Sequence, residues 1–267
     1  MPIERRAGLK INSLTLGKGD DQALLLHCSL ANSRAWLPLA DEFKDTLSMT
    51  AFDLPGHGMS QDWDYTSDYQ DRCLDISSTF INKPIHLVGH SFGATVALRV
   101  AQRFPNFVQS ISLIEPVFFA AAFSDYRELE AQFMLDHADY FSAGEDKNWQ
   151  LAAELFLKLW GNNEDWNLLS ESKKRQFAQR IPLTFEVSKA IYSDPHDMLK
   201  EHGFSSLTGK ASIIYGDMSH FIMPYICKAL SVRIPNTELK CIQNAGHMLP
   251  ITHPKICAQI INKTIEP

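Results

Sequence analysis

In the N-terminal part of the chain, segments with the apolar pattern of a β-strand take turns with segments that have apolar residues at helical spacing. Apolar and polar residues alternate over residues 8–17, which predicts an edge strand. Continuous apolar runs predict strands buried on both faces of a sheet, at residues 23–27, 47–53, 84–88 and 110–114. Between these runs, apolar residues at helical spacing predict helices at residues 33–44, 65–80 and 94–104. This order predicts an α/β fold, with a mostly parallel central sheet flanked by helices.

The alternation of strand and helix stops near Pro116 and resumes near residue 206. Between these points the pattern is helical, most clearly over residues 126–141 and 146–160. Strand and helix patterns then return, at residues 211–215, 220–230, 238–242 and 253–265. We therefore expect an α/β core of residues 1–117 and 206–267, interrupted by a helical cap of residues 118–205.

Composition and charge narrow the classes of partner. Of the 267 residues, 45% are hydrophobic and 21% are charged, as in globular chains with a sizeable core. The formal net charge is -6, whereas nucleic acids and anionic membranes attract proteins with a surplus of Lys and Arg. No apolar run approaches the ~18 residues of a membrane span. We expect a small-molecule partner, no nucleic acid, no membrane, and a monomer or a homodimer.

The five cysteines are scattered, and none forms a CxxC pair. This pattern favours neither a disulfide framework nor a zinc site, and it indicates a reducing compartment. Residues 1–10 carry charges and no apolar stretch, so we expect no signal peptide and a cytoplasmic location.

The strongest chemical signal is the segment Gly89-His90-Ser91-Phe92-Gly93. It follows a predicted strand and precedes a predicted helix, which is the context that a G-x-S-x-G nucleophile elbow requires. The turn is so sharp that side chains two positions before and after Ser91 would collide, and both positions are Gly. We expect Ser91 to be a nucleophile and the helix that follows to favour negative charge beside it.

A serine hydroxyl needs a base, and in this kind of fold the chain order is Ser, then Asp or Glu, then His. His247 follows one predicted strand and Asp217 follows another, at the edge of the sheet where ligands bind. We therefore expect His247 to be the base and Asp217 the acid that orients it. Glu115, which ends the strand at residues 110–114, is the alternative acid, and His220 is the rival base.

An oxyanion needs two backbone donors. One is expected to be the amide of Phe92, the residue after the nucleophile. The other should come from the loop after the strand at residues 23–27, with Ser29 preferred and Leu30 second. Asn32 either contacts the substrate or braces this loop.

On these residues the chain resembles the α/β-hydrolase superfamily, in the branch of small capped esterases, lactonases and acyltransferases. The resemblance covers residues 7–118 and residue 206 onward, and it includes Asp53-Leu54-Pro55-Gly56-His57-Gly58-Met59-Ser60, which is similar to the family's D-x-P-G-x-G-x-S loop. Gly56 and Gly58 would supply its backbone turns. The chain departs from the family at His27-Cys28, where the family usually has His-Gly. The resemblance also implies that the cap roofs the substrate pocket.

These expectations converge on a serine hydrolase that cleaves a small carboxylic ester, lactone or thioester through an acyl-Ser91 intermediate. The reaction needs neither a cofactor nor a metal. Carbon–carbon bond hydrolysis or acyl transfer on the same triad is an alternative, because a fold does not fix a reaction. A ligand receptor or signalling partner that retains the triad is the non-enzymatic alternative. Haloalkane dehalogenation is disfavoured, because the resembling enzymes carry Asp where this chain has Ser91.

Overall fold

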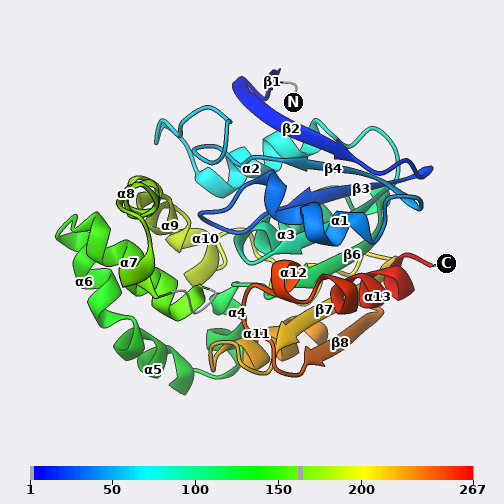
Figure 1. The fold of residues 1–267 in the computed structure, drawn as a ribbon. Helices are drawn as coiled ribbons and strands as arrows, with labels where there is room; N and C mark the ends of the chain where they lie inside the picture. Colours follow the sequence, from blue (N-terminus) through cyan, green and yellow to red (C-terminus); the bar gives the residue numbers. More distant parts are fainter. Residues whose placement is uncertain (1–2, 162–164, 267) are drawn as a thin grey trace.

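The computed structural model describes residues 3–161 and 165–266, which form an eight-stranded sheet with helices on both faces (Figure 1). The strand order is β1-β2-β4-β3-β5-β6-β7-β8, in which the β1–β2 and β2–β4 pairs are antiparallel and the remaining pairs are parallel. The strands are β1 (Ile3–Arg6), β2 (Leu9–Leu16), β3 (Asp21–Leu26), β4 (Leu47–Phe52), β5 (Ile85–His90), β6 (Val108–Ile114), β7 (Lys210–Gly216) and β8 (Thr237–Ile242). The predicted fold class is confirmed.

Strand β3 shows why the apolar runs form central strands. Leu24 and Leu26 point into one hydrophobic cluster, while Ala23 and Leu25 point into a second cluster on the opposite face. Side chains alternate across a strand, so a run that is apolar at every position is buried on both sides. The first cluster is covered by α2 (Tyr69–Ser78), α3 (Phe92–Arg103) and α11 (Met223–Ser231), and the second by η1 (Ser33–Trp36), α1 (Leu37–Asp41), α12 (Leu249–Thr252) and α13 (Pro254–Ile265).

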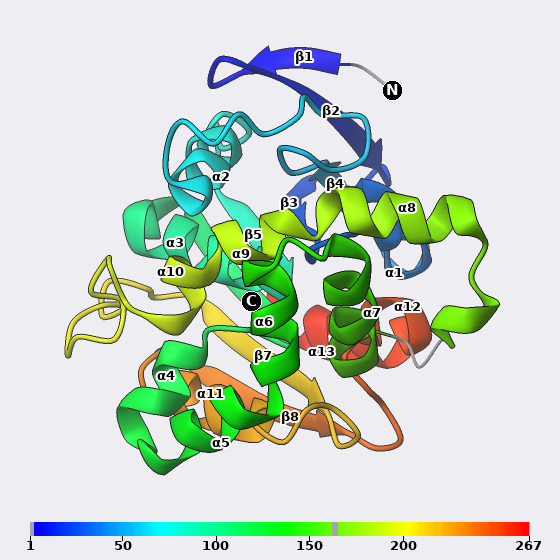
Figure 2. The ribbon, with the colours of Figure 1, turned by 90° about the vertical axis from the view of Figure 1, so that its left-hand side faces the viewer.

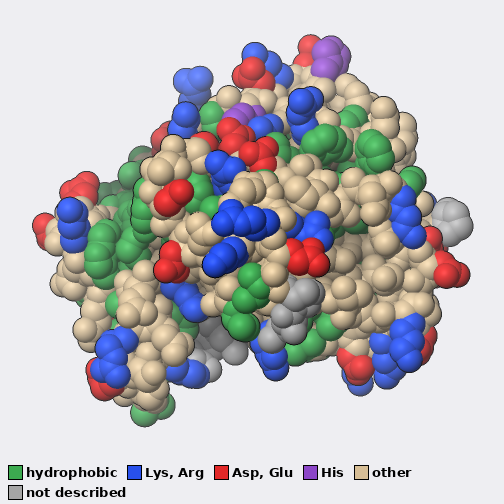
Figure 3. All heavy atoms as spheres, turned by 90° about the horizontal axis from the view of Figure 1, so that it is seen from above, with side chains coloured by type: hydrophobic (Ala, Val, Ile, Leu, Met, Phe, Trp, Pro, Cys, Tyr) green, Lys and Arg blue, Asp and Glu red, His purple; other side chains and the backbone are tan. Residues whose placement is uncertain are grey.

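The edge of the sheet at β1 and β2 carries charges of both signs. Basic and acidic side chains lie beside one another on the face of the molecule that carries these strands (Figure 3), and Arg6 pairs with Glu4 at 2.8 Å. Strand β1 was not predicted, because its exposed, charged sequence has no apolar alternation. Charged side chains on an exposed edge disfavour pairing with the edge of another sheet.

The chain between β6 and β7 is mostly helical as far as Tyr192, and residues 193–209 form turns. It comprises α4 (Phe119–Asp125), α5 (Glu128–Asp136), α6 (Ala138–Glu145), α7 (Trp149–Trp160), η3 (Trp166–Leu168), α8 (Glu171–Arg180), α9 (Pro182–Glu186) and α10 (Ser188–Tyr192). Several of these helices, α6 to α10 among them, lie across one end of the sheet (Figure 2). A small hydrophobic cluster of their own, including Tyr140, Ala152 and Ile181, also takes in Leu30. These helices therefore pack onto the loop that follows β3.

Two helix predictions were wrong in detail. Residues 126–141 are not one helix, because α5 ends at Asp136 and α6 begins at Ala138, with His137 between them at φ -104° and ψ 4°. Residues 33–44 form a 3-10 turn and a single short α-helix. None of the helices in residues 3–161 and 165–266 is long and apolar enough to cross a membrane.

Candidate active site

Ser91 lies in the sharp turn between β5 and α3. Its φ of 55° and ψ of -119° fall in a region that side chains rarely occupy, and such strain is typical of functional positions. A Cβ at Gly93 would lie 2.0 Å from the carbonyl oxygen of Leu26, and one at Gly89 would lie 2.5 Å from Cα of Ala94. Glycine at both positions therefore allows β3, β5 and α3 to approach closely enough for this turn.

The Ser91 hydroxyl lies in hydrogen-bonding contact with a histidine and, through it, with a carboxylate. The distance from Ser91 Oγ to His247 Nε2 is 3.0 Å, and that from His247 Nδ1 to Glu115 Oε2 is 2.9 Å. An ionised carboxylate only accepts hydrogen bonds, so Nδ1 carries the hydrogen and the lone pair of Nε2 faces the hydroxyl. The Ser91 hydroxyl then donates to His247, as proton transfer requires.

Glu115 is held in place by donors on its other carboxylate oxygen. Oε1 accepts from the amide of Gly216 and from the hydroxyl of Ser219, both at 2.7 Å, and the side chain is fully buried. Glu115 follows β6, the strand between β5 and β7, and its φ is 51°. Three hydrogen bonds thus compensate the burial of its charge and fix the oxygen that faces His247.

Asp217, the preferred acid of the sequence analysis, is placed elsewhere. Its side chain is exposed, its carboxylate accepts from the amide of Ala245 at 3.3 Å, and the described structure gives it no hydrogen bond to His247. The physical reason is the path of the chain after β7. The Asp217 amide still donates to the carbonyl of Ile242 at the end of β8, so Asp217 stays beside β8, where its carboxylate accepts from the Ala245 amide. The geometry favours Glu115, the alternative acid.

The loop after β3 is braced by two buried histidines. His27 donates through Nδ1 to the carbonyl of Cys28 at 2.7 Å and accepts through Nε2 from the amide of Leu54 at 2.9 Å. The amide of Leu30 donates to His57 Nε2 at 3.1 Å. The Leu30 amide therefore already has an acceptor, whereas Ser29 lines both cavities beside Ser91. Asn32 braces the loop, because its side chain accepts from the amide of Arg34.

Phe92 is the first residue of α3, so its amide is one of the N–H groups that a helix leaves without an intrahelical acceptor. The partial positive charge of this helix end faces the same space as the Ser91 hydroxyl. Ser29 and Phe92 both line the inner cavity beside Ser91, and their role as backbone donors to an oxyanion stays a prediction.

The other histidines near the site have different partners. His90 donates through Nε2 to the carbonyl of His247 at 2.8 Å, and burial lowers the pKa of His90 to about 3. His220 stacks on Trp160 with ring centroids 4.9 Å apart, and burial lowers its pKa to about 4. Trp160 in turn contacts the His247 ring edge-on at 5.2 Å. The geometry gives His247, rather than His220, the contact with Ser91.

Two cavities meet at Ser91 and share Ser29, Phe156 and Trp160 in their walls. The outer cavity, of about 300 Å³, is also lined by His247 and by apolar side chains of α7, α8 and α12. The inner cavity, of about 30 Å³, reaches toward Phe119, Tyr140 and Ile191. The sequence alone did not single out these walls, because they come from segments far apart along the chain.

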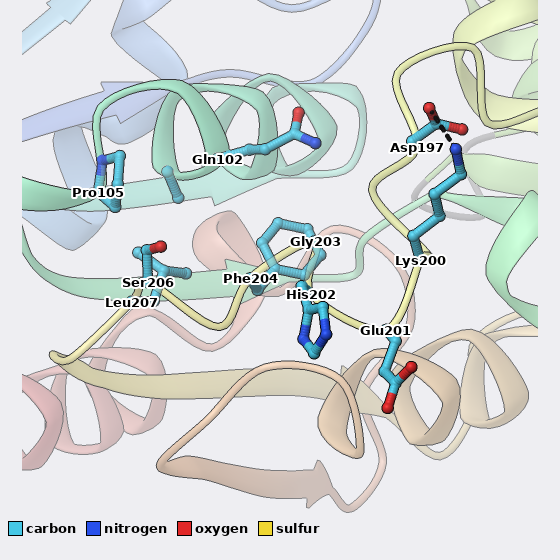
Figure 4. Close-up of a pocket in the computed structure, with 11 residues that line it drawn as sticks. Gln102, Pro105, Asp197, Lys200, Glu201, His202, Gly203, Phe204, Ser206 and Leu207 are labelled. Carbon is cyan, nitrogen blue, oxygen red and sulfur yellow. Dashed lines mark ion pairs between the residues drawn. The ribbon is translucent and has the colours of Figure 1, made fainter.

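A depression of about 640 Å³ lies away from the triad (Figure 4). It is lined by the end of α3 and by residues 197–207, and Lys200 pairs there with Asp197 at 2.8 Å. None of its lining residues belongs to the Ser91–His247–Glu115 group. Its size therefore does not make it the catalytic candidate.

One group among the described residues has ligand atoms close enough for a metal ion, namely Asp68, Asp71 and His196. The Arg99 guanidinium lies 3.0 Å from the Asp71 carboxylate, where it occupies an oxygen and adds a positive charge. The group contains none of the residues around Ser91. Its position and its cation do not favour a role for metal at the candidate active site.

The chain is similar to several known proteins in sequence and in fold. Residues 23–260 match the model of the Alpha/beta hydrolase family. The chain is 26% identical over 262 residues to a pimeloyl-[acyl-carrier protein] methyl ester esterase of Methylococcus capsulatus, covering 94% of this chain and 96% of that one. It is 30% identical over 121 residues to the dihydrolipoyllysine-residue acetyltransferase component of the acetoin cleaving system of Cupriavidus necator; this match covers 43% of this chain and about a third (32%) of that one.

Among solved structures, the chain is similar to an ancestral haloalkane dehalogenase, with a TM-score of 0.74 and 20% sequence identity. That match covers 99% of this chain and 98% of the other. At this identity the likeness concerns the fold alone.

Proposed function

Because the chain belongs to the alpha/beta hydrolase family, we propose that it is a serine hydrolase in which Ser91 is the nucleophile, His247 the base and Glu115 the acid behind the base. The observation that carries this proposal is the hydrogen-bonded line from Glu115 Oε2 through the His247 ring to Ser91 Oγ, with distances of 2.9 and 3.0 Å. Glu115 takes the role that the sequence analysis preferred for Asp217, because its carboxylate contacts Nδ1.

In the proposed reaction, Ser91 Oγ attacks the carbonyl carbon of the substrate while His247 Nε2 takes the hydroxyl proton. Glu115 keeps the imidazole in the required tautomer and stabilises its charged form. The amides of Phe92 and Ser29 are proposed to donate to the oxyanion. His247 then gives its proton to the leaving group. In the second half of the reaction, water attacks the acyl carbon while His247 takes a proton from it. Ser91 then leaves with that proton, and the acid is released.

The proposed substrate is a small-molecule carboxylic ester, lactone or thioester. The mainly apolar walls of the outer cavity support an apolar substrate, since such sites bind through burial with few polar contacts. The methyl ester esterase relative, similar over nearly its full length, supports ester chemistry. We further propose that residues 118–205 act as a cap on a core of residues 1–117 and 206–267, since Phe156, Trp160 and Phe177 line the outer cavity together with Ser91.

The direct test is turnover of p-nitrophenyl acetate by the wild-type chain and by Ser91→Ala. We expect multiple turnovers in the wild type and a loss of roughly 10⁴-fold or more in kcat for the variant, because the remaining groups lack a nucleophile. A circular dichroism melt serves as the control for folding. Unchanged kcat in Ser91→Ala would remove the proposal, and stabilisation by an ester ligand without product would favour a receptor.

A further inference from the structure

The inner and outer cavities differ in whether His247 lines them. His247 is part of the wall of the outer cavity, whereas the described lining of the inner cavity includes Phe92 and Val117 and not His247. A group that leaves from the tetrahedral intermediate must take its proton from His247 Nε2. The leaving alcohol therefore belongs in the outer cavity, and the acyl chain extends from the carbonyl carbon into the inner one.

The two cavities also differ in size. The outer cavity of about 300 Å³ is at the lower end of ordinary ligand sites, which begin at roughly 300 Å³. The inner cavity of about 30 Å³ is about twice the roughly 10–15 Å³ that one water molecule needs. A group of one or two carbon atoms fills it. Its walls include the side chains of Val187, Ile191 and Tyr192.

The described lining of the inner cavity holds no cationic side chain that could pair with a charged acyl chain. Tyr140 and Thr184 bond to each other through their hydroxyls at 2.6 Å, and the Thr184 hydroxyl also donates to the carbonyl of Ile181 at 2.6 Å. Among its described lining residues there is no Lys, Arg or His. A carboxylate placed there would be buried without a cationic partner, which is costly.

We infer that this chain hydrolyses esters with a short, uncharged acyl group, of acetyl size, and a larger apolar alcohol. The inference rests on the proposed function and assigns the two parts of its substrate. Water supplies the hydroxyl of the released acid, and the alcohol leaves with the proton that His247 took from Ser91, so atoms balance without a further reactant. Val187 and Ile191 are the residues that set the acyl length.

A pair of constitutional isomers tests the assignment. Pentyl acetate and methyl hexanoate contain the same atoms, but the long chain lies on the alcohol in the first and on the acyl group in the second. We expect kcat/KM of the wild-type chain to be roughly tenfold or more higher for pentyl acetate. A preference for methyl hexanoate, or equal rates, would overturn the inference while leaving the serine hydrolase proposal intact. Failure to hydrolyse either isomer or p-nitrophenyl acetate would instead reject the proposed function.

Two inner-cavity variants and one outer-cavity variant show which wall sets the acyl length. Val187→Ala and the milder Ile191→Val should raise the ratio of kcat/KM for pentyl butanoate to that for pentyl acetate by about threefold or more, because each enlarges the inner cavity. Ile251→Ala, in the outer cavity, should change the dependence on alcohol length and leave this acyl ratio as it was. An unchanged ratio in both inner-cavity variants, or a shift only in Ile251→Ala, would overturn the inference.

Discussion

Glu115 has a separate task for each carboxylate oxygen. One oxygen accepts from His247 Nδ1, and the other accepts from Gly216 and Ser219, so the side chain cannot rotate without losing several buried hydrogen bonds. A buried group held in this way orients the imidazole before the substrate arrives. Catalysis gains from such fixed geometry, because nothing has to reorganise as charge develops.

We predict that Glu115→Gln lowers kcat for p-nitrophenyl acetate by roughly 10³- to 10⁴-fold. The amide of Gln has one donor end, which must face either the N–H of His247 or the N–H of Gly216, so two donors oppose each other in either orientation. Asp217→Asn is the matched control and should stay within about threefold of the wild type, because its exposed carboxylate only bonds to Ala245. An equal or larger loss in Asp217→Asn would contradict the assignment of the acid.

At this scale the sequence predicted which serine and histidine would meet, but it preferred Asp217 as the acid and gave Glu115 only as the alternative. Ser91 is marked by two glycines and His247 by its place after the last strand. Glu115 and Asp217 both follow parallel strands and both precede His247, so chain order does not separate them. The choice depends on where the loop after each strand carries its carboxylate, and hydrophobic periodicity does not encode that path.

At the scale of elements, the turn between β5 and α3 leaves no room for a side chain at either of its glycines. Strand β3 passes so close that Gly93 lies against the backbone of Leu26, and Gly89 lies against the backbone of Ala94. Backbone atoms cannot yield as a flexible side chain can. The packing of three elements therefore depends on the absence of two Cβ atoms.

We predict that Gly93→Ala destabilises the protein by about 2 kcal/mol or more, because its Cβ would meet a carbonyl oxygen in a well-packed region. Gly246→Ala is the control, since a Cβ there has no atom within 4 Å. Urea unfolding monitored by tryptophan fluorescence measures both. Equal unfolding midpoints for the two variants would show that the elbow tolerates a side chain.

The central strands and most core helices were predictable from the sequence. A strand buried on two faces is a continuous apolar run, and a helix buried on one face has apolar residues at helical spacing. The break at His137 was not, since apolar spacing continues through it: Phe133 in α5 and Tyr140 in α6 are both buried. The ring of His137 contacts the rings of Trp160 and His220, with centroids 5.8 and 5.0 Å away. Packing between distant segments decided this boundary, and local pattern does not report it.

For the whole molecule, three buried histidines link stability to pH. Burial lowers the pKa of His27 to about 4 and those of His57 and His90 to about 3, so all three are neutral in the folded state. In the unfolded chain they would bind protons below a pH of about 6.5. Their effect on stability is absent above that pH, and the folded state is progressively disfavoured as the pH falls toward 4.

We predict that the free energy of unfolding falls steadily between about pH 6.5 and about pH 4, by on the order of 1–2 kcal/mol per buried histidine at about pH 5. The titration of Asp53 does not change the free energy of unfolding in this pH range. Burial raises the pKa of Asp53, but hydrogen bonds from Ser33, Met59 and Asn12 outweigh burial and hold it below 3.8, so its contribution is lost only at lower pH. Urea midpoints that stay constant from about pH 7 to about pH 4.5 would contradict the prediction.

The most direct measurement is the site at which a fluorophosphonate reacts. If Ser91 is activated by His247 and Glu115, peptide mapping by mass spectrometry will find one adduct, on Ser91. Labelling will be lost in Ser91→Ala, strongly slowed in Glu115→Gln and nearly unchanged in Asp217→Asn. An adduct on another residue, or wild-type labelling of the Ser91→Ala chain, would contradict the account.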